Sequence, residues 1–492
     1  MTRAISPETV RDWATGRALD LWVVLGEPVD LTAAAKDGAV VRGGDPADPV
    51  AVFSAMRETN VLDVRRVGVV TRSPRGVATA RCSGAAAVVA IEGTASAGDL
   101  LAAEPDVVVD EAAFAGLYAT RYGTTRARRP QVLLNPGPAL TSDAVKRAAA
   151  GVDLCHREPE YESLERDVRE KLRRVADVGP SWGVAFISGS GTLATETALR
   201  AATRPGKRAL IVVNGVYGER LHAMATRAGI DVVVHERDWT EAADPAVVDE
   251  LMGAMPEIDV VAIVHHETTT GMLNPVSAIA GVARAHGVRV LVDAVSSFGA
   301  EELELEGSGI DFVCCSSNKC LQGLPGAAFV LVSPTGLERI ETVPPSSVYL
   351  DLAGYLRGAE TGSPPFTPPI PAVAALDAAL DEVLVRGPEA HRRLYAERAA
   401  VLDEVLAGVG LEPIVPPERR SRTVRSVPLP PGVDYTVLHD RLKGEGFVIY
   451  AGQGALADSI FRVCCMGTLE PAILRDFGSR LAVALEREPA PA

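Results

Sequence analysis

The sequence predicts an α/β protein whose main domain is built on a mainly parallel β-sheet. Short apolar runs, such as 209–213, 259–264 and 288–293, alternate with segments of helical spacing, such as 217–228 and 276–286. These runs are almost continuously apolar, which is typical of parallel strands covered on both faces. Ligands of such sheets bind beyond the carboxyl ends of the strands. The residues that follow each strand are therefore the first candidates for function.

The ends of the predicted helices carry their own signals. The helix over 217–228 is expected to end at Gly229 and the helix over 276–286 at Gly287, because glycine readily adopts the left-handed conformation that closes many helices. One strand is expected to end near Ile187. The other expected strands are the apolar runs 231–235, 312–315 and 327–332.

Composition along the chain predicts the domain organisation. Residues 1–118 alternate apolar runs with Gly, Pro and Asp turns, whereas 119–130 is polar and basic and indicates a linker. A Pro-rich stretch at 364–371 (PPFTPPIP) interrupts the later strand–helix pattern. We therefore expect a large domain over 131–384 and a smaller α+β C-terminal domain over 385–492.

Overall composition argues against several kinds of partner. The 492 residues carry a formal net charge of −15 without a long basic stripe, so nucleic acid is not expected. No apolar run reaches the ~18 residues that span a bilayer, and the charged N-terminus does not read as a signal peptide. The seven cysteines are odd in number and lack CxxC spacing. This favours a reducing cytoplasm over a disulfide framework or a metal site.

A Gly-rich turn follows the strand that ends near Ile187. The residues 188–192 (SGSGT) precede the helical run 193–202. Such a turn aims free backbone N–H groups and the positive end of the helix dipole at one point, which suits a phosphate monoester. The hydroxyl groups of Ser190 and Thr192 add possible donors around Gly191. Gly-rich turns before helices are also common without a ligand.

Two ionisable residues follow later strands, one strand–helix unit apart. Asp293 ends a buried strand, where an acid can cap a helix, form a core salt bridge or hold a pyridine nitrogen protonated. Lys319 follows the strand 312–315, where a lysine can be a surface charge or form a Schiff base. A phosphate cradle, an acid and a lysine in this order match the phosphate, ring nitrogen and aldehyde of pyridoxal 5'-phosphate (PLP). The combination predicts a PLP site.

These segments resemble the class V, fold-type I PLP aminotransferases, and most closely the 2-aminoethylphosphonate–pyruvate transaminases. The resemblance runs from about residue 133 to about residue 467. It implies the fold-type I architecture, a homodimer, and amino transfer between 2-aminoethylphosphonate and pyruvate, giving phosphonoacetaldehyde and alanine, in either direction. The matching segments are LLNPGPALTSDAVKRA, SGSGTLATE, VNGVYGER, VHHETTTGMLNP, VDAVSSFGA, SSNKCLQGLPGAAFV, GFVIYAG and FRVCCMG.

The resemblance also implies cofactor contacts. Lys319 would be the Schiff-base lysine and proton shuttle, with Asn318 beside it, and Asp293 would be the partner of the pyridine nitrogen. An aromatic ring would hold the planar cofactor flat, although a core tyrosine is the alternative for that position. The remaining implied contacts are Ser190, Gly191 and Thr192 for the phosphate, Tyr217 for the ring face and Thr268 for the phenolic oxygen.

Substrate contacts are implied in the same way. Arg462 would anchor the anionic group of each substrate, because its planar fork matches a carboxylate or a phosphonate. Without the resemblance, Arg462 would read as an exposed arginine on a strand. Thr367 would add a hydroxyl group across the interface of a homodimer.

Some features leave the substrate open. The segment FRVCCMG carries two cysteines where the family more often has a Gly-Asn-type loop, and 360–367 diverges. The alternatives are alanine–glyoxylate or phosphonopyruvate transamination and, in another class, a non-catalytic scaffold. A cysteine desulfurase is disfavoured because no cysteine stands in the context of a reactive loop. His265 and His266 are neighbours on a strand and point to opposite faces, which favours a structural role over a metal site.

The N-terminal region resembles a different family. Residues 45–110 are similar to the last part of haloacid-dehalogenase (HAD)-type hydrolases, nearest to the phosphonoacetaldehyde hydrolases. Arg72 and Gly76 stand where these hydrolases carry Mg²⁺-binding carboxylates, and no DxDxT-like nucleophile motif precedes them. We expect a truncated, inactive HAD-like relic over 1–118. By analogy alone, the two resemblances share one metabolite, because phosphonoacetaldehyde is the product of the transaminases and the substrate of the hydrolases.

Overall fold

The computed structural model describes residues 131–486 and, before them, residues 21–25, 39–42, 67–71, 77, 80, 87–91 and 107–109. The chain divides into two compact units, residues 1–131 and 132–492. Each unit is described by itself.

The described strands of the first unit form a sheet in the order β2-β1-β3-β4-β5, in which every pair is parallel. A fully parallel sheet is typical of α/β proteins. Arg72, Gly76 and the expected linker 119–130 lie outside the described residues. The strands are β1 (Leu21–Leu25), β2 (Ala39–Arg42), β3 (Val67–Thr71), β4 (Ala87–Ile91) and β5 (Val107–Val109).

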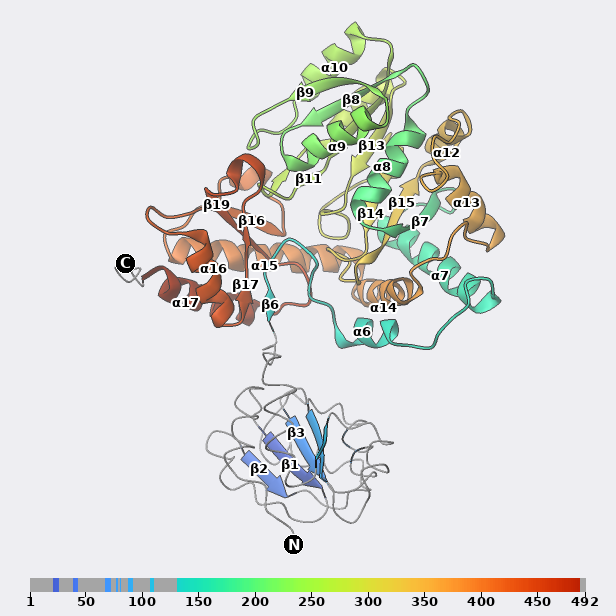
Figure 1. Ribbon diagram of the computed structural model, residues 1–492. Helices are drawn as coiled ribbons and strands as arrows, with labels where there is room; N and C mark the ends of the chain where they lie inside the picture. The colour runs from blue at the N-terminus through green and yellow to red at the C-terminus, as the bar shows by residue number, and fades with distance from the viewer. Residues whose placement is uncertain are drawn as a thin grey trace. The chain divides into compact units, whose positions relative to one another are not determined.

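A seven-stranded sheet forms the centre of the second unit, in the order β7-β15-β14-β13-β10-β8-β9 (Figure 1). Strand β15 runs antiparallel to both of its neighbours, and the other pairs are parallel. The prediction of a mainly parallel sheet is therefore confirmed. The strands are β7 (Gly183–Gly189), β8 (Arg208–Val213), β9 (Asp231–Glu236), β10 (Ile258–Val264), β13 (Arg289–Asp293), β14 (Phe312–Ser316) and β15 (Gly326–Val332).

Helices cover both faces of this sheet, which explains why its central strands are almost continuously apolar. In β10, Val261 and Ile263 join one hydrophobic core, whereas Val260 and Val264 join the other. This split follows from the two-residue period of a strand. On one face lie α8 (Gly191–Ala202), α9 (Val216–Arg227), α12 (Pro334–Glu341) and α13 (Leu352–Thr361). On the other lie α7 (Pro159–Ala176), α10 (Pro245–Ala254), α11 (Val276–Ala285) and α14 (Ile370–Arg386).

Two connections correct the expected alternation of strands and helices. Residues 294–311, between β13 and β14, form turns and no α-helix, and the same holds for 317–325 between β14 and β15. The first connection buries Phe298, Leu305 and Ile310 in the core, so it covers the sheet without a helix. The second joins antiparallel neighbours, which need only a short link. The prediction of a helix between Asp293 and Lys319 is therefore wrong. The two residues nevertheless lie at the ends of neighbouring strands, Asp293 as the last residue of β13 and Lys319 in the turn after β14.

A separate hydrophobic core consists mainly of buried apolar residues from the C-terminal part of the chain, between Leu402 and Ala484. It includes Leu134, because β6 (Val132–Leu133) pairs in parallel with β17 (Phe447–Val448). The sheet β16-β19-β18 consists of β16 (Val424–Pro428), β18 (Tyr450–Ala451) and β19 (Ile460–Cys464) and is antiparallel. Its helices are α15 (Pro388–Gly408), α16 (Tyr435–Gly444) and α17 (Pro471–Glu486), with short 3-10 turns at Pro417–Arg419 and Gly454–Leu456.

The remaining elements of the second unit are α6 (Asp143–Ala149) and the hairpin of β11 (His266–Glu267) and β12 (Met272–Leu273). Among the helices that the structure describes, none combines the length and the apolar character that crossing a membrane requires.

Candidate active site

The Gly-rich turn leads from β7 directly into α8. Ser190 is the N-cap residue of α8, and its side chain makes no capping hydrogen bond. The first N–H groups of a helix have no partner within the helix, so those of Gly191 and Thr192 point outward from its N-terminus. A Cβ atom at Gly191 would lie 2.4 Å from Cγ2 of Val295, so only glycine fits there. The turn therefore has the geometry of an anion cradle.

Arg220 brings a positive charge to this cradle. Its Nη1 donates a hydrogen bond to the Thr192 hydroxyl at 3.2 Å, and its guanidinium carbon lies 4.7 Å from the centre of the Tyr217 ring. Sequence reasoning missed Arg220. Its place three residues after Tyr217, on the same side of α9, was the available signal.

Glu267 fixes the beginning of α9, and sequence reasoning missed it as well. Its side chain is fully buried, and its two carboxylate oxygens accept the backbone N–H groups of Gly218 at 2.8 Å and Tyr217 at 3.3 Å. Burial raises the pKa of the Glu267 carboxyl to about 8, although these N–H groups oppose the shift. Glu267 thereby holds the backbone of Tyr217 in place.

Asp293 stands at the end of β13. Its carboxylate accepts the Val295 N–H at 3.0 Å and the Thr195 hydroxyl at 3.4 Å. Burial raises the pKa of Asp293, against the effects of the Val295 N–H and of the positive charge of Lys319. Within residues 131–486, no cationic side chain forms a hydrogen bond or ion pair with this carboxylate. A half-buried carboxylate in this situation can accept a cationic partner such as a protonated ring nitrogen.

Lys319 lies in the turn after β14, and its Nζ donates a hydrogen bond to the Ser296 hydroxyl at 3.1 Å. A Cβ atom at Gly137, which has a φ of +122°, would lie 3.0 Å from Cε of Lys319, so this glycine leaves room for the lysine side chain. The Ser296 hydroxyl also lies 2.6 Å from the Thr268 hydroxyl. Lys319 and Thr268 therefore meet through Ser296, a third residue that sequence reasoning missed.

Asn318 contributes through its backbone. Its carbonyl oxygen accepts the N–H of Ala139 at 2.9 Å, which ties the segment containing Gly137 to the lysine turn.

Arg462 lies on β19, is only 2% exposed, and reaches the segment that contains Thr268. Its Nε donates to the Ala451 carbonyl at 2.8 Å. Its Nη1 donates to Oε1 of Gln453 at 3.2 Å and to the Thr268 carbonyl at 3.5 Å. Within the described part of the chain, Nη2 has no protein hydrogen bond, which leaves donors for an anion. Burial overturns the alternative of an exposed arginine.

Thr367 stands apart from these residues. It is exposed, and its carbonyl oxygen accepts the Ser188 hydroxyl at 3.3 Å, near the end of β7. Among the described residues of one chain, it forms no hydrogen bond with Lys319 or Arg462.

Both histidines are buried, and burial lowers the pKa of His265 to about 4 and of His266 to about 3. The Nδ1 atom of His266 lies 3.0 Å from the Ser296 carbonyl oxygen. Because a carbonyl oxygen only accepts, Nδ1 carries the proton. This contact is compatible with the structural role expected for His266, which stays a prediction.

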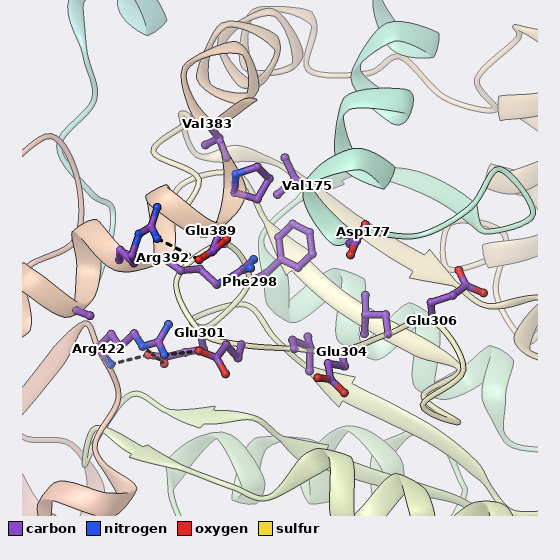
Figure 2. A pocket seen from close by; sticks show the side chains of 18 residues that line it. Val175, Asp177, Phe298, Glu301, Glu304, Glu306, Val383, Glu389, Arg392 and Arg422 are labelled. Carbon is purple, nitrogen blue, oxygen red and sulfur yellow. Dashed lines mark hydrogen bonds and ion pairs between the residues drawn. The ribbon is translucent and has the colours of Figure 1, made fainter. Parts of the chain in front are cut away.

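A pocket of about 670 Å³ lies elsewhere in the second unit, and none of the site residues described above lines it (Figure 2). It is lined by charged side chains, among them Glu301, whose carboxylate accepts the Arg422 N–H at 2.5 Å. Burial raises the pKa of Glu301 to about 7. This pocket offers no lysine beside a phosphate cradle, so it does not match the expected chemistry.

Comparisons with known proteins agree with the geometry. The family described as Aminotransferase class-V matches residues 142–464. The 2-aminoethylphosphonate–pyruvate transaminase of Burkholderia ambifaria is 35% identical over 361 residues, which cover 72% of this chain and 95% of that protein. The transaminase of the same name from Syntrophobacter fumaroxidans is 36% identical over 347 residues, 70% of this chain and 93% of that protein.

Solved structures show the same architecture. An aspartate aminotransferase from Thermus thermophilus superimposes with a TM-score of 0.66 at 33% identity and covers 72% of this chain and 99% of its own. An alanine–glyoxylate aminotransferase from Nostoc sp. superimposes with a TM-score of 0.69 at 28% identity, covering 73% and 96%.

The residues at the strand ends fit PLP part by part. The N-terminus of α8 offers N–H groups and hydroxyls for a phosphate, Asp293 offers a half-buried carboxylate for the ring nitrogen, and Lys319 offers an amine. The chain therefore belongs to the class-V aminotransferase family and is a PLP-dependent aminotransferase.

Proposed function

We propose that this enzyme transfers an amino group between 2-aminoethylphosphonate and pyruvate, giving phosphonoacetaldehyde and alanine, in either direction. The observation that carries the anionic nature of both substrates is the buried guanidinium of Arg462, whose Nη2 forms no hydrogen bond with the described residues of the chain. Both proposed substrates end in an anionic group with paired oxygens, so one arginine can serve both half-reactions. The names of the two curated relatives support this choice.

The proposed roles follow from the contacts of each side chain. Asp293 would keep a negative charge beside the ring nitrogen. Lys319 would bond to the cofactor and, once its Nζ is free, take a proton from the substrate carbon and return it to the cofactor. Bound PLP supplies an electron sink for the negative charge that develops at that carbon. The proposed phosphate cradle is Ser190, Gly191 and Thr192, with Tyr217 against the ring, Asn318 beside the lysine and Thr268 near the phenolic oxygen.

Arg220 adds to this set. Its hydrogen bond to Thr192 supports a role in balancing the charge of the cofactor phosphate. Its position over Tyr217 would also hold that ring in its stacking position.

A second candidate is alanine–glyoxylate transamination. It is favoured by the structural likeness to the Nostoc enzyme of that name. The planar carboxylates of alanine and glyoxylate would use the same Arg462 fork, so the arginine by itself does not separate the two candidates. The difference lies in the group that the pocket must accept beside the amine, a phosphonate in one case and a carboxylate in the other.

Further proposals concern the assembly. The enzyme would be a cytoplasmic homodimer in which Thr367 adds a hydroxyl to the site of the neighbouring subunit, and its exposure in the single chain supports this role. The large domain would span 131–384 and the small domain 385–492, and the separate C-terminal core supports that division. Residues 1–118 would be an inactive HAD-like relic, for which the parallel sheet offers general support.

The substrate proposal is tested with the purified full-length chain and PLP. Alanine formation is measured with pyruvate as acceptor and 2-aminoethylphosphonate as donor, and glyoxylate-dependent consumption of alanine is measured in parallel. Turnover of the aminophosphonate at a kcat/KM well above that of the alanine–glyoxylate pair supports the first candidate. The reverse order supports the second.

A further inference from the structure

Ser296 lies between two of the proposed site residues and belongs to neither the phosphate cradle nor the lysine turn. We propose that Ser296 is a positioning residue that holds the Lys319 amine in both of its protonation states and aims it at the reacting carbon. This inference rests on the role proposed for Lys319. It goes beyond that role because it assigns the control of the lysine to a hydroxyl from another strand end.

The contacts of the Ser296 hydroxyl carry the inference. It accepts a hydrogen bond from Nζ of Lys319 at 3.1 Å and lies 2.6 Å from the hydroxyl of Thr268. The Thr268 hydroxyl also lies 3.4 Å from the carbonyl oxygen of His266, to which it can donate. The three side chains therefore form one chain of hydrogen bonds that ends at a backbone acceptor.

The direction of this chain follows the charge of Lys319. An ammonium group only donates, so Ser296 accepts from Nζ, donates to Thr268, and Thr268 donates to the His266 carbonyl. A neutral amine can also accept, and the Ser296 proton can then turn toward Nζ while Thr268 donates to Ser296. A hydroxyl fits both states at the same position. A carboxylate there would favour the ammonium form, and an alkyl group would leave the amine without a partner.

The backbone of Ser296 is held independently of its hydroxyl. Its carbonyl oxygen accepts the Nδ1 proton of His266 at 3.0 Å and the thiol of Cys320 at 3.3 Å. The side chain itself is only 4% exposed. Removing the hydroxyl therefore leaves these two contacts in place, so the effect on the amine can be separated from an effect on the fold.

The next residue supplies a matched control. Ser297 is 1% exposed, and its hydroxyl donates to the Ala294 carbonyl at 3.4 Å, its only hydrogen bond with the residues that the structure describes. Ser296→Ala and Ser297→Ala remove the same atom from adjacent buried positions. Ser296→Thr keeps the hydroxyl at the first position.

The experiment measures single-turnover rates of the PLP-loaded variants with alanine, with and without deuterium at its α-carbon, together with borohydride trapping of PLP and the melting temperature. We expect Ser296→Ala to retain trapping and melting temperature, and to react roughly 10- to 100-fold more slowly, as loss of a hydrogen bond to a charged group implies. Its primary isotope effect should rise because proton transfer becomes slower. Ser297→Ala should match the wild type, and Ser296→Thr should recover a large part of the rate.

Several outcomes would overturn the inference. These are an unchanged rate and isotope effect in Ser296→Ala, equal losses in the two alanine variants, loss of trapping together with rate, or a Ser296→Thr enzyme no faster than Ser296→Ala. The half-reaction with alanine belongs to both candidate reactions, because alanine is the donor for glyoxylate and the amine formed from pyruvate in the aminophosphonate reaction. The result therefore does not depend on turnover of the aminophosphonate. Trapping of PLP in a Lys319→Ala variant would contradict the role of the lysine itself, which keeps the two failures distinct.

Discussion

The carboxylate of Glu267 accepts the backbone N–H of Gly218 at 2.8 Å, although 49 residues separate them. The contact needs glycine on the helix side. A Cβ atom at Gly215 would lie 2.4 Å from Oε2 of Glu267, and one at Gly218 would lie 2.7 Å from the carbonyl oxygen of Val212. Because α9 carries both Tyr217 and Arg220, Glu267 determines where these two side chains stand beside the phosphate cradle.

Glu267→Gln should change how stability depends on pH. Burial raises the pKa of Glu267 from 4.5 to about 8, so the folded state binds the proton that the unfolded state has already released. The wild type therefore loses stability as pH rises between these values, by at most about 1.4 kcal/mol per pH unit. A neutral glutamine does not titrate, so its stability does not fall with pH in this way. Its amide NH2 group, however, cannot accept the hydrogen bond from the Tyr217 N–H.

Melting temperatures of the two apo-proteins at pH 5.5 and pH 8.5 check this prediction. Glu267→Gln should be the less stable protein at the lower pH, because it loses one backbone acceptor at a cost of ~1–3 kcal/mol. The difference should shrink or reverse at the higher pH. A difference that stays constant between the two pH values would show that Glu267 does not titrate in this range.

Lys319→Ala should abolish amino transfer and remove the borohydride-reducible link between PLP and the protein. The reason is chemical, because alanine has no amine to bond the cofactor or to move the proton. Mass spectrometry of the reduced protein measures the link. Lys146→Ala, at an exposed position on α6, is the control and should keep both the amino transfer and the reducible link to PLP. A reduced PLP adduct in Lys319→Ala would assign the link to a different residue.

The strand ends of the main sheet could be predicted because they stand out in the sequence. Buried parallel strands read as short apolar runs, so the polar residues directly after them, such as Asp293 and Lys319, are visible without a structure. The helix ends at Gly229 and Gly287 could be predicted for a similar local reason, and both glycines have positive φ angles of 73° and 68°.

Ser296, Glu267 and Arg220 could not be identified in this way. Each reaches its partner through a contact between distant segments, and a serine near a strand end is also typical of an ordinary turn. The turns of 294–311 were missed for a related reason. A connection between parallel strands usually contains a helix, and only packing reveals that Phe298 and Leu305 bury enough surface without one.

Asp293→Asn should retain the fold and lose most of the activity. The asparagine keeps the shape of the side chain and the Val295 and Thr195 contacts within reach, but it removes the charge that would face the protonated ring nitrogen. We expect a loss of ~2–4 kcal/mol of transition-state stabilisation, or roughly 10²- to 10³-fold in kcat. Asp249→Asn, at a position 58% exposed beside His286, is the control. Steady-state kinetics of both variants would contradict the role of Asp293 if their kcat values were alike.

Arg462 and Arg425 form a natural pair for testing the anion anchor. They lie on the neighbouring strands β19 and β16 and are both buried. Arg425 uses two nitrogens on Asp403, with Nε–Oδ1 and Nη2–Oδ2 distances of 2.6 and 2.7 Å. Arg462 bonds to carbonyl and amide oxygens instead and keeps Nη2 free of described protein partners. One guanidinium is therefore committed to an internal ion pair, and the other is available to a substrate.

Arg462→Lys keeps the positive charge but loses the fork, so both half-reactions should weaken mainly in apparent substrate affinity, by ~1.5–3 kcal/mol. Arg425→Lys should instead lower the melting temperature, because it breaks a partly buried two-point ion pair, and leave substrate affinity unchanged. Single-turnover titrations with 2-aminoethylphosphonate and with pyruvate measure the affinities, and thermal unfolding measures the stabilities. If Arg462→Lys binds both substrates as tightly as the wild type, the anion is held by other residues. The substrate proposal would then lose the observation on which it depends.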